Sequence, residues 1–328
     1  FRRSLAKVTF SAAKKFFAVL TASLAALAAE AEDGLPAPMP VGGQAVIEGV
    51  LMKGYTRWGL AVRRADGEIV TEHWLAKNWS KTGWGKIPVV RGFLNMIEML
   101  REGFKALSKS ASLSLGEDDE MTTRDVFLTG LVAAVMVIGL FIVLPVYAAD
   151  WIRRAAGLSA WSGHLIEGCV RGLVFVGYLG MIGLWKDMAR VLAYHGAEHK
   201  TINAYESRRP MTVESVCRCS RLHPRCGTSF LLIVVIVSIV VFSLAGPGGI
   251  VWRVGSRVCL VPVVVGVSYE FIRAMSRLGR AGRCVMAPAM SLQYLTTREP
   301  GADQVEVGIR SLEEALDLKF DSDRTEAV

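Results

Sequence analysis

The residues best suited to chemistry lie in one short segment near the middle of the chain. Residues 194–200 read Tyr-His-Gly-Ala-Glu-His-Lys, which places His195, Glu198 and His199 at positions i, i+3 and i+4. On a helix these three side chains share one face. Two imidazoles one turn apart can hold a metal ion, and the carboxylate beside them can be a ligand or a general base.

The order H-x-x-E-H is also that of the inverzincin peptidases. The similarity to those enzymes covers five residues, and no other part of their architecture is recognisable in the chain. The motif therefore predicts a metal site more strongly than it predicts proteolysis. The alternative is a pair of histidines that are hydrogen-bonded to nearby carboxylates.

A second group of possible ligands follows shortly after the first. Cys217, Cys219, His223 and Cys226 fall within ten residues. In one interpretation, His223 completes the site begun by the two histidines, with Cys226 and Glu206 as secondary candidates. In another, the cysteines and His223 form a separate structural zinc site, and in a third they are reduced, partly buried thiols. Imidazole and thiolate ligands suit Zn²⁺, although imidazole with carboxylate also admits iron or manganese.

Two further acids are candidates for the same site. Glu48 lies in an otherwise apolar, glycine-flanked stretch, where a carboxylate needs a partner or a raised pKa. It could face the metal site as a secondary ligand, or form a salt bridge with Lys53 or Arg91. Glu270 could pair with Arg273 or point into the same site.

Composition indicates the kind of protein that carries these residues. The chain has 328 residues, is 52% hydrophobic with a mean hydropathy of +0.37, and has a formal net charge of +8. A nucleic-acid binder would explain the charge but not the apolarity, whereas a membrane protein explains both because Lys and Arg collect on its cytoplasmic loops. Six cysteines are too few for a disulfide scaffold. We therefore expect an α-helical polytopic membrane protein.

Hydropathy predicts about four transmembrane helices. The first and third are long uncharged runs of the length that a bilayer requires. The second includes Glu167 and Arg171, which are four residues apart and can neutralise each other. The fourth contains Pro262. The second and fourth segments are therefore less clearly apolar helices than the other two, and each is either a full helix, which we favour, or a re-entrant piece. The predicted spans lie near residues 126–149, 165–187, 227–245 and 256–272 of a membrane domain over residues 126–285.

The basic residues predict the orientation of these spans. Eight of them lie between the second and third spans, and the positive-inside rule places that loop and both termini in the cytoplasm. The predicted His/Cys-bearing metal loop, residues 188–226, would then be cytoplasmic. The eight are Lys186, Arg190, Lys200, Arg208, Arg209, Arg218, Arg221 and Arg225.

The remaining segments are predicted to be soluble. Residues 40–125 form a small α+β cytoplasmic domain, with a hairpin around Asp66-Gly67, a pair that suits a type I′ turn, and a helix after Pro88. Residues 286–328 form a C-terminal cytoplasmic segment with a docking helix. Residues 1–39 resemble the n- and h-regions of a signal peptide and are interpreted as a truncated or variable leader.

Four segments together resemble the YqhQ-like family of bacterial membrane proteins, a domain of unknown function. They are residues 42–50, 194–201, 220–228 and 295–300, they occur in order, and the resemblance covers residues 40–318. Leu51 replaces the Met that is more frequent in the family, which is a mild change. The resemblance implies a bacterial cytoplasmic (inner) membrane protein, described as a predicted metal-dependent enzyme, but it implies no reaction.

These observations lead to three hypotheses. The first is a membrane-embedded zinc enzyme, hydrolase-like, in which His195, His199 and His223 hold the metal and Glu198 is the general base or the fourth ligand. Its substrate would be a membrane protein segment or a lipid-linked molecule, and its partners would be membrane lipids or other membrane proteins, not nucleic acid. The second is a membrane scaffold or assembly factor with a closed, structural metal site. The third is a transporter, indicated by ionisable residues at membrane depth.

Overall fold

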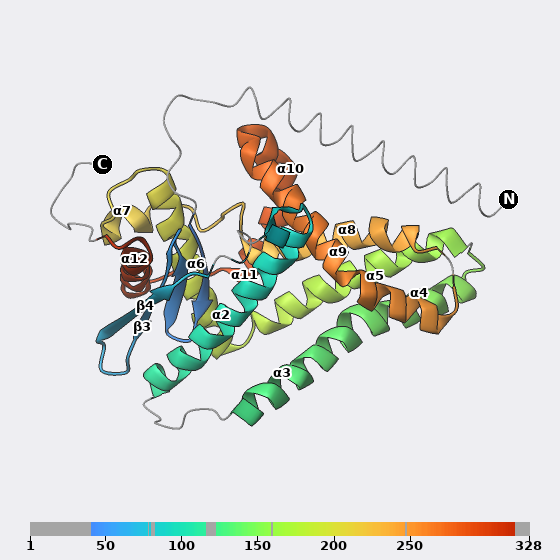
Figure 1. Ribbon diagram of the computed structural model, residues 1–328, viewed down its shortest axis with the longest axis horizontal. Coiled ribbons are helices and arrows are strands. Elements are labelled where there is room, and N and C mark those ends of the chain that lie inside the picture. Colours follow the sequence, from blue (N-terminus) through green and yellow to red (C-terminus); the bar gives the residue numbers. More distant parts are fainter. Residues whose placement is uncertain are drawn as a thin grey trace.

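The protein is described here by a computed structural model that covers residues 41–77, 79, 83–115, 123–158, 160–246 and 248–318. The predicted leader, residues 1–39, lies outside the described residues. Figure 1 shows two regions, a group of long helices and a small sheet that helices cover. The candidate metal residues lie where these regions meet.

Four helices among the described residues are long and apolar enough to cross a membrane, which confirms the expected number of spans. The two weakly apolar segments form full helices rather than re-entrant pieces, and Pro262 lies inside the last of them. The four candidate spans are Leu128–Ala155, Ser162–Ile182, Gly227–Leu244 and Ile250–Arg277.

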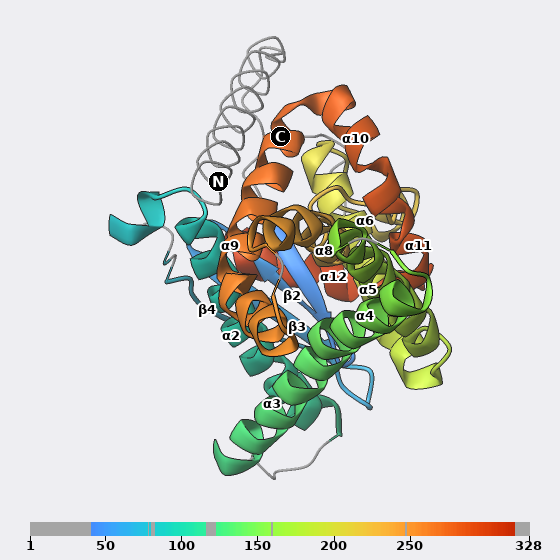
Figure 2. The same cartoon turned by 90° about the vertical axis from the view of Figure 1, so that its right-hand side faces the viewer.

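The first span is built from three helical pieces, and the others are single helices. A π-helical turn, η3 (Gly139–Val143), separates α3 (Thr123–Ile138) from α4 (Leu144–Ala155). In both views α3 extends away from the other spans, while α4 packs against α5 (Figure 2). The remaining spans are α5 (Ala160–Ile182), α8 (Gly227–Leu244) and α9 (Ile250–Arg277).

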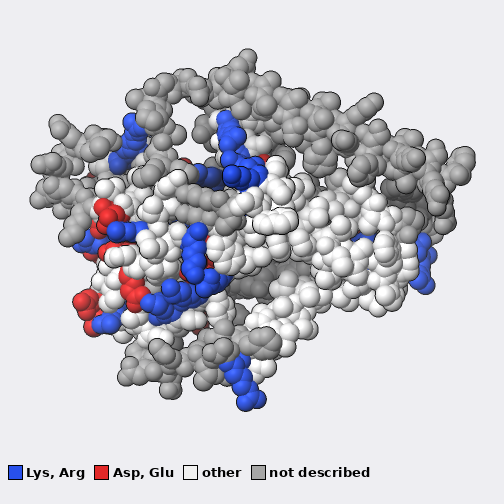
Figure 3. All heavy atoms as spheres, in the orientation of Figure 1, with Lys and Arg blue, Asp and Glu red and all other residues white. Residues whose placement is uncertain are grey.

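Charge is distributed unevenly between the two regions. On the face drawn in Figure 3, Lys, Arg, Asp and Glu gather over the end of the molecule that holds the sheet. The described surface of the long helices is almost uninterrupted by charge on that face. The helices also expose many large apolar side chains, as expected where the surrounding medium is lipid.

The sheet is an antiparallel meander in the order β1-β2-β3-β4. Every residue of β2 except the last is buried, and β3 is buried in all but its two end residues. A strand with one solvated face would alternate, so this pattern indicates that both faces of the sheet are covered. The strands are β1 (Gly42–Val46), β2 (Gly49–Lys53), β3 (Arg57–Arg63) and β4 (Ile69–Leu75).

Helices from three parts of the chain cover the sheet. On one face, α2 (Val90–Leu115) packs against a core that includes Leu51 and Trp58. On the other, α6 (Lys186–Glu206) and α12 (Ala302–Leu316) pack against a core that includes Met52. The helix after Pro88, the segment between the spans and the C-terminal helix therefore build one three-layered unit.

The short elements complete this unit, and two predicted details are corrected. The segment between the second and third spans is largely helical rather than a loop. In the β3–β4 hairpin, the Gly67 N–H donates to the Arg64 carbonyl at 3.0 Å, and Gly67 has a φ of +91°. The connection is therefore a three-residue loop with a left-handed glycine, not the predicted type I′ turn. The short helices are η2 (Gly83–Lys86), α7 (Val213–Cys217), α10 (Gly279–Ser291) and α11 (Gln293–Thr296).

A buried ionic cluster joins the membrane helices. Glu167 of α5 is 1% exposed and accepts a hydrogen bond from Arg171 at 2.9 Å, as the i, i+4 spacing predicted. Arg257 of α9 donates to both oxygens of Glu167 at 3.0 and 3.1 Å, and Arg253 donates to Oε2 at 3.3 Å. Arg171 also donates to the carbonyl of Phe141 at 2.9 Å, inside the π-helical turn. Since both oxygens of Glu167 are paired, the cluster cross-links α5 to α9.

Candidate metal centre

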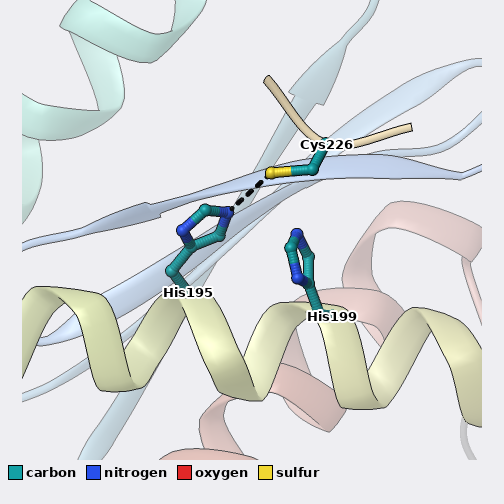
Figure 4. Close-up of side chains that lie close together, drawn as sticks. All are labelled: His195, His199 and Cys226. Atoms are coloured by element: carbon teal, nitrogen blue, oxygen red, sulfur yellow. Dashed lines mark hydrogen bonds between the residues drawn. The ribbon is translucent and has the colours of Figure 1, made fainter. Parts of the chain in front are cut away.

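Two elements bring three potential ligands together. Helix α6 carries His195 and His199 on one face, as the spacing predicted, with Glu198 beside them. Cys226 is the N-cap residue of α8, so the start of a membrane helix fixes its position. In Figure 4 the two imidazoles and the thiol point toward one another.

The geometry of this group suits a metal ion. One ligand atom from each of His195, His199 and Cys226 lies within 4.8 Å of the other two. The Cys226 Sγ lies 3.2 Å from the His195 Nε2, and the centroids of the two imidazole rings are 4.4 Å apart. Zinc accepts imidazole nitrogen and thiolate sulfur in tetrahedral sites, and catalytic sites use three protein ligands.

Backbone carbonyls orient both imidazoles. The His195 Nδ1 lies 2.7 Å from the carbonyl oxygen of Thr296, and the His199 Nδ1 lies 2.6 Å from that of Arg221. A carbonyl only accepts hydrogen bonds, so each Nδ1 carries a proton, and in a neutral imidazole this leaves the lone pair on Nε2. This is the arrangement by which proteins fix the tautomer and direction of metal-binding histidines.

Two buried atoms of the group lack a hydrogen-bond partner. They are the His199 Nε2 and the Glu198 Oε2, and the latter lies 3.8 Å from the His195 Nε2. Leaving a buried polar atom unpaired costs about 1–3 kcal/mol, so such atoms call for an explanation. A metal ion and its bound water would satisfy both atoms. Burial also raises the pKa of Glu198 and lowers the pKa of His199.

A strand of the sheet packs directly onto Glu198. A Cβ atom at Gly43 would lie 3.0 Å from both the Cγ and the Oε1 of Glu198, and 2.8 Å from the carbonyl of Leu51. Only glycine fits there without displacing the glutamate. Composition and spacing did not reveal this role, although Gly43 belongs to the first of the four segments that carry the family resemblance.

His223 lies beside the group but is engaged elsewhere. Its ring centroid is 5.9 Å from that of His199, and its Nε2 lies 3.2 Å from the Oε2 of Glu206. Glu206 also pairs with Arg225. The backbone of His223 is held by Gln293, and burial lowers the pKa of the imidazole to about 4. The structure thus brings Cys226 to the two helical histidines, while His223 and Glu206 bind each other.

The other cysteines of the segment do not join a ligand group among the described residues. Cys217 and Cys219 are free thiols, and the Cys219 thiol donates to the carbonyl of Ser215 at 3.6 Å. Cys219 packs in the apolar core between α6, α7 and α12. These contacts favour the interpretation of both residues as reduced, partly buried thiols.

Both additional acids have partners that the sequence did not predict. Glu48 pairs with Arg190 of α6, at 2.6 Å from the Nη2, and accepts a hydrogen bond from the Tyr194 hydroxyl at 3.2 Å. The proposed partners of Glu48 are taken, because Lys53 pairs with Glu98 at 2.6 Å.

Arg91, the other proposed partner of Glu48, pairs instead with Glu270. Glu270 therefore binds neither Arg273 nor the candidate site, and its ion pair fastens α2 to α9. The predicted partners of Glu48 and Glu270 were wrong for the same reason. Each carboxylate pairs with an arginine that is far away in the sequence.

A second layer of contacts surrounds the thiol. The Cys226 Sγ lies 3.1 Å from the Thr228 hydroxyl, which in turn lies 3.2 Å from the hydroxyl of Thr296. Sequence reasoning singled out neither threonine, yet both belong to segments that carry the family resemblance. All four of those segments therefore meet at this centre, through Gly43, the helical motif, Cys226 with Thr228, and Thr296.

Comparisons with known proteins agree with that resemblance. The model of the family described as "Protein of unknown function (DUF1385)" matches residues 87–318. The chain is 35% identical over 306 residues to "Uncharacterized protein YqhQ" of Bacillus subtilis (strain 168), which covers 88% of this chain and 96% of that protein. No solved structure matches the chain.

Proposed function

This chain belongs to the DUF1385 family of proteins of unknown function, and from that premise we propose that it is a zinc-dependent hydrolase embedded in the bacterial cytoplasmic membrane. His195, His199 and Cys226 hold the metal, and Glu198 is the general base. The observation that carries the proposal is the pair of buried, unpartnered atoms at a convergent set of metal-ligand side chains.

The side chains divide the chemical work as follows. Zn²⁺ held by His195, His199 and Cys226 would supply Lewis acidity and would lower the pKa of a bound water. Glu198 accepts a proton from the attacking water and returns it to the leaving group. The carbonyls of Thr296 and Arg221 keep both imidazoles in the tautomer that binds metal.

A structural zinc site in a membrane scaffold is the alternative to a catalytic site. A structural site is closed by a fourth protein ligand, and the candidates beside the group are Glu198 and His223. The His223 Nε2 faces Glu206 instead, and this supports a site with an open position.

A transporter receives less support. The ionisable residues at membrane depth that suggested transport are Glu167 and its arginines. Both oxygens of that carboxylate are paired with guanidinium groups, which favours a cross-link between helices over a mobile ion path.

We further propose that the sheet unit and both termini lie in the cytoplasm. The eight basic residues between the second and third spans support this orientation. Four spans return the chain to its starting side, and this fits the packing of α2, α6 and α12 on one sheet. Membrane lipids, and other membrane proteins, are the proposed partners.

The proposal is tested by metal content, measured by mass spectrometry on detergent-purified protein. Wild type is expected to carry about one zinc per chain. His199→Ala and Cys226→Ser are expected to lose it, because each removes one of three ligands. Glu198→Gln is expected to keep the metal and lose hydrolytic activity by a factor of about 100 or more, the usual contribution of a general base.

Two control variants separate the alternatives. Cys217→Ser, a nearby thiol outside the ligand group, should keep the zinc. His223→Gln should also keep it, and loss of zinc in that variant would support a closed, structural site. A wild-type protein that takes up no metal, even after zinc is added, would contradict the proposed enzyme.

A further inference from the structure

A cleft opens beside the candidate metal centre, at the end of α5 nearest the sheet. Its volume is about 450 Å³. One wall is formed by Gly180, Gly183 and Leu184 at the end of the second membrane span, and the other by Arg221, residues 294 and 295, and residues 297–299. The cleft therefore lies where a membrane helix gives way to the sheet unit.

The walls of the cleft are continuous with the metal centre. Arg221 lines the cleft with its side chain while its carbonyl binds the Nδ1 of His199. Leu295 and Thr297 also line it, and the residue between them, Thr296, binds the Nδ1 of His195. The residues whose carbonyls orient both histidines therefore line the cleft or are adjacent in sequence to residues that do.

The cleft carries unpaired positive charge. Neither Arg221 nor Arg298 forms an ion pair with a carboxylate of the described residues, although Arg221 lies over the Tyr294 ring at 5.4 Å. Arg298 donates to the carbonyl of Gly183 at 2.5 Å. Glu299 is the single acid in the described lining and is paired with Lys200 at 2.5 Å. The cleft therefore favours an anion, and guanidinium groups suit phosphate.

Its rim is apolar and aromatic. Leu184 is 84% exposed and Trp185 is 70% exposed, and Tyr294 also lies open. Tryptophan and tyrosine at the end of a span are typical of the membrane–water boundary. At Gly180 an added Cβ would meet no atom within 4 Å, so the absence of a side chain leaves room beside the helix.

We propose that this cleft binds a phosphate-bearing lipid, which enters from the membrane and presents its headgroup to the metal centre. Arg221 and Arg298 receive the phosphate, and the acyl chains lie along Gly180 and Leu184. The assignment of this lipid as substrate depends on the proposed hydrolase, whereas its binding does not depend on the metal.

Binding is tested with delipidated, full-length protein in a nonionic detergent, with phosphatidylglycerol as probe and native mass spectrometry as readout. We expect one bound lipid with at least tenfold preference over phosphatidylcholine. Arg221→Gln and Arg298→Gln should each weaken binding about tenfold, the loss expected for one charge-assisted hydrogen bond. Arg209→Gln, an exposed arginine outside the cleft, should leave binding unchanged.

A pair of glycine variants tests the groove itself. Gly180→Leu should fill the groove without a clash and reduce lipid binding about tenfold or more. Gly177→Leu, one turn earlier on the same helix, also has no atom within 4 Å of an added Cβ but does not line the cleft. It should bind lipid as wild type does. Equal lipid binding by both glycine variants would overturn the proposal.

Two further measurements are needed. One distinguishes a lipid from a soluble phosphate compound as the occupant of the cleft, and the other tests lipid binding separately from the proposed hydrolase. If glycerol phosphate competes as well as phosphatidylglycerol, the occupant is a soluble phosphate compound and the lipid assignment fails. Cys226→Ser should lose the metal and bind the lipid normally, because the Cys226 thiol contacts His195 and Thr228, which do not line the cleft, so loss of metal and loss of lipid are measured independently. In cobalt-substituted protein the lipid should shift the visible absorption of the metal, and an unchanged spectrum would contradict the placement of the headgroup at the centre.

Discussion

Two buried glutamates, one in each region of the molecule, show how differently this fold treats a carboxylate. Glu167, in the membrane helices, is 1% exposed and receives hydrogen bonds from three arginines on both of its oxygens. Glu198, beside the candidate metal centre, is 4% exposed and its Oε2 has no partner. Burial is therefore nearly the same, while hydrogen bonding is not.

The difference separates a structural group from a functional one. A saturated cluster stabilises the packing of its helices, and removal of one member leaves the others unpaired. A buried polar atom without a hydrogen-bond partner lowers the stability of the fold. Such an atom is retained where function needs it, here to bind a proposed metal ion and its water. The following predictions test that distinction, beginning with the largest expected effect.

Glu167→Gln should destabilise the protein most. The change removes the negative charge that three buried guanidinium groups share, and breaking such a pair costs about 3–5 kcal/mol. Thermal unfolding in detergent measures the loss. Glu214→Gln breaks an exposed i, i+4 pair with Arg218 and should cost no more than about 0.5 kcal/mol. Similar stabilities of the two variants would show that the cluster is not a structural cross-link.

Acid should destabilise the metal-free protein through His223. Burial lowers its folded-state pKa from 6.5 to about 4, so between these values the unfolded chain binds a proton that the folded chain does not. The contribution of His223 to the free energy of unfolding is therefore fully present above pH 6.5. It is lost as the pH is lowered toward 4, by up to about 3 kcal/mol. His223→Gln should flatten this part of the curve of unfolding free energy against pH. A wild-type curve that rises on acidification would contradict the sign.

Glu198→Gln should have the smallest effect on stability, although it is the same chemical change as Glu167→Gln. The Glu198 Oε2 accepts no hydrogen bond, and its ion contact is with the His195 imidazole at 3.8 Å rather than with a guanidinium group. Burial raises the pKa of Glu198, so a neutral amide of equal size is tolerated at this position. We expect an unfolding free energy within about 0.5 kcal/mol of wild type, or higher, as is usual when a functional group is neutralised. A loss as large as that in Glu167→Gln would make Glu198 a structural residue.

Local patterns predicted several features correctly. Hydropathy located four spans because a membrane helix needs an uninterrupted run of apolar residues, which can be counted along the chain. The i, i+4 spacing predicted that His195 and His199 share a helix face, because that relation depends on one turn of backbone. The pairing of Glu167 with Arg171 follows from the same rule.

Relations between distant segments could not be predicted in this way. His223 and Cys226 are three residues apart, and the sequence favoured His223 as a ligand, with Cys226 as a secondary candidate. The structure favours Cys226 because it caps α8 and so faces α6, while Glu206 draws the His223 imidazole away. The position of Cys226 directly before an uncharged run was the one local signal for that cap.

The sequence by itself therefore determined the membrane class, the number of spans and the helical pair of histidines, because these depend on neighbours along the chain. The tertiary structure alone decided which third side chain joins the two histidines, the partners of Glu48 and Glu270, and the packing of Gly43 against Glu198. Those contacts form only when the sheet, α6, α12 and the membrane helices pack together. Packing joins residues that are separated by 31 positions, as in Cys226 and His195, or by 142 and 179 positions, as in the ion pairs of Glu48 and Glu270, and no local period encodes such contacts.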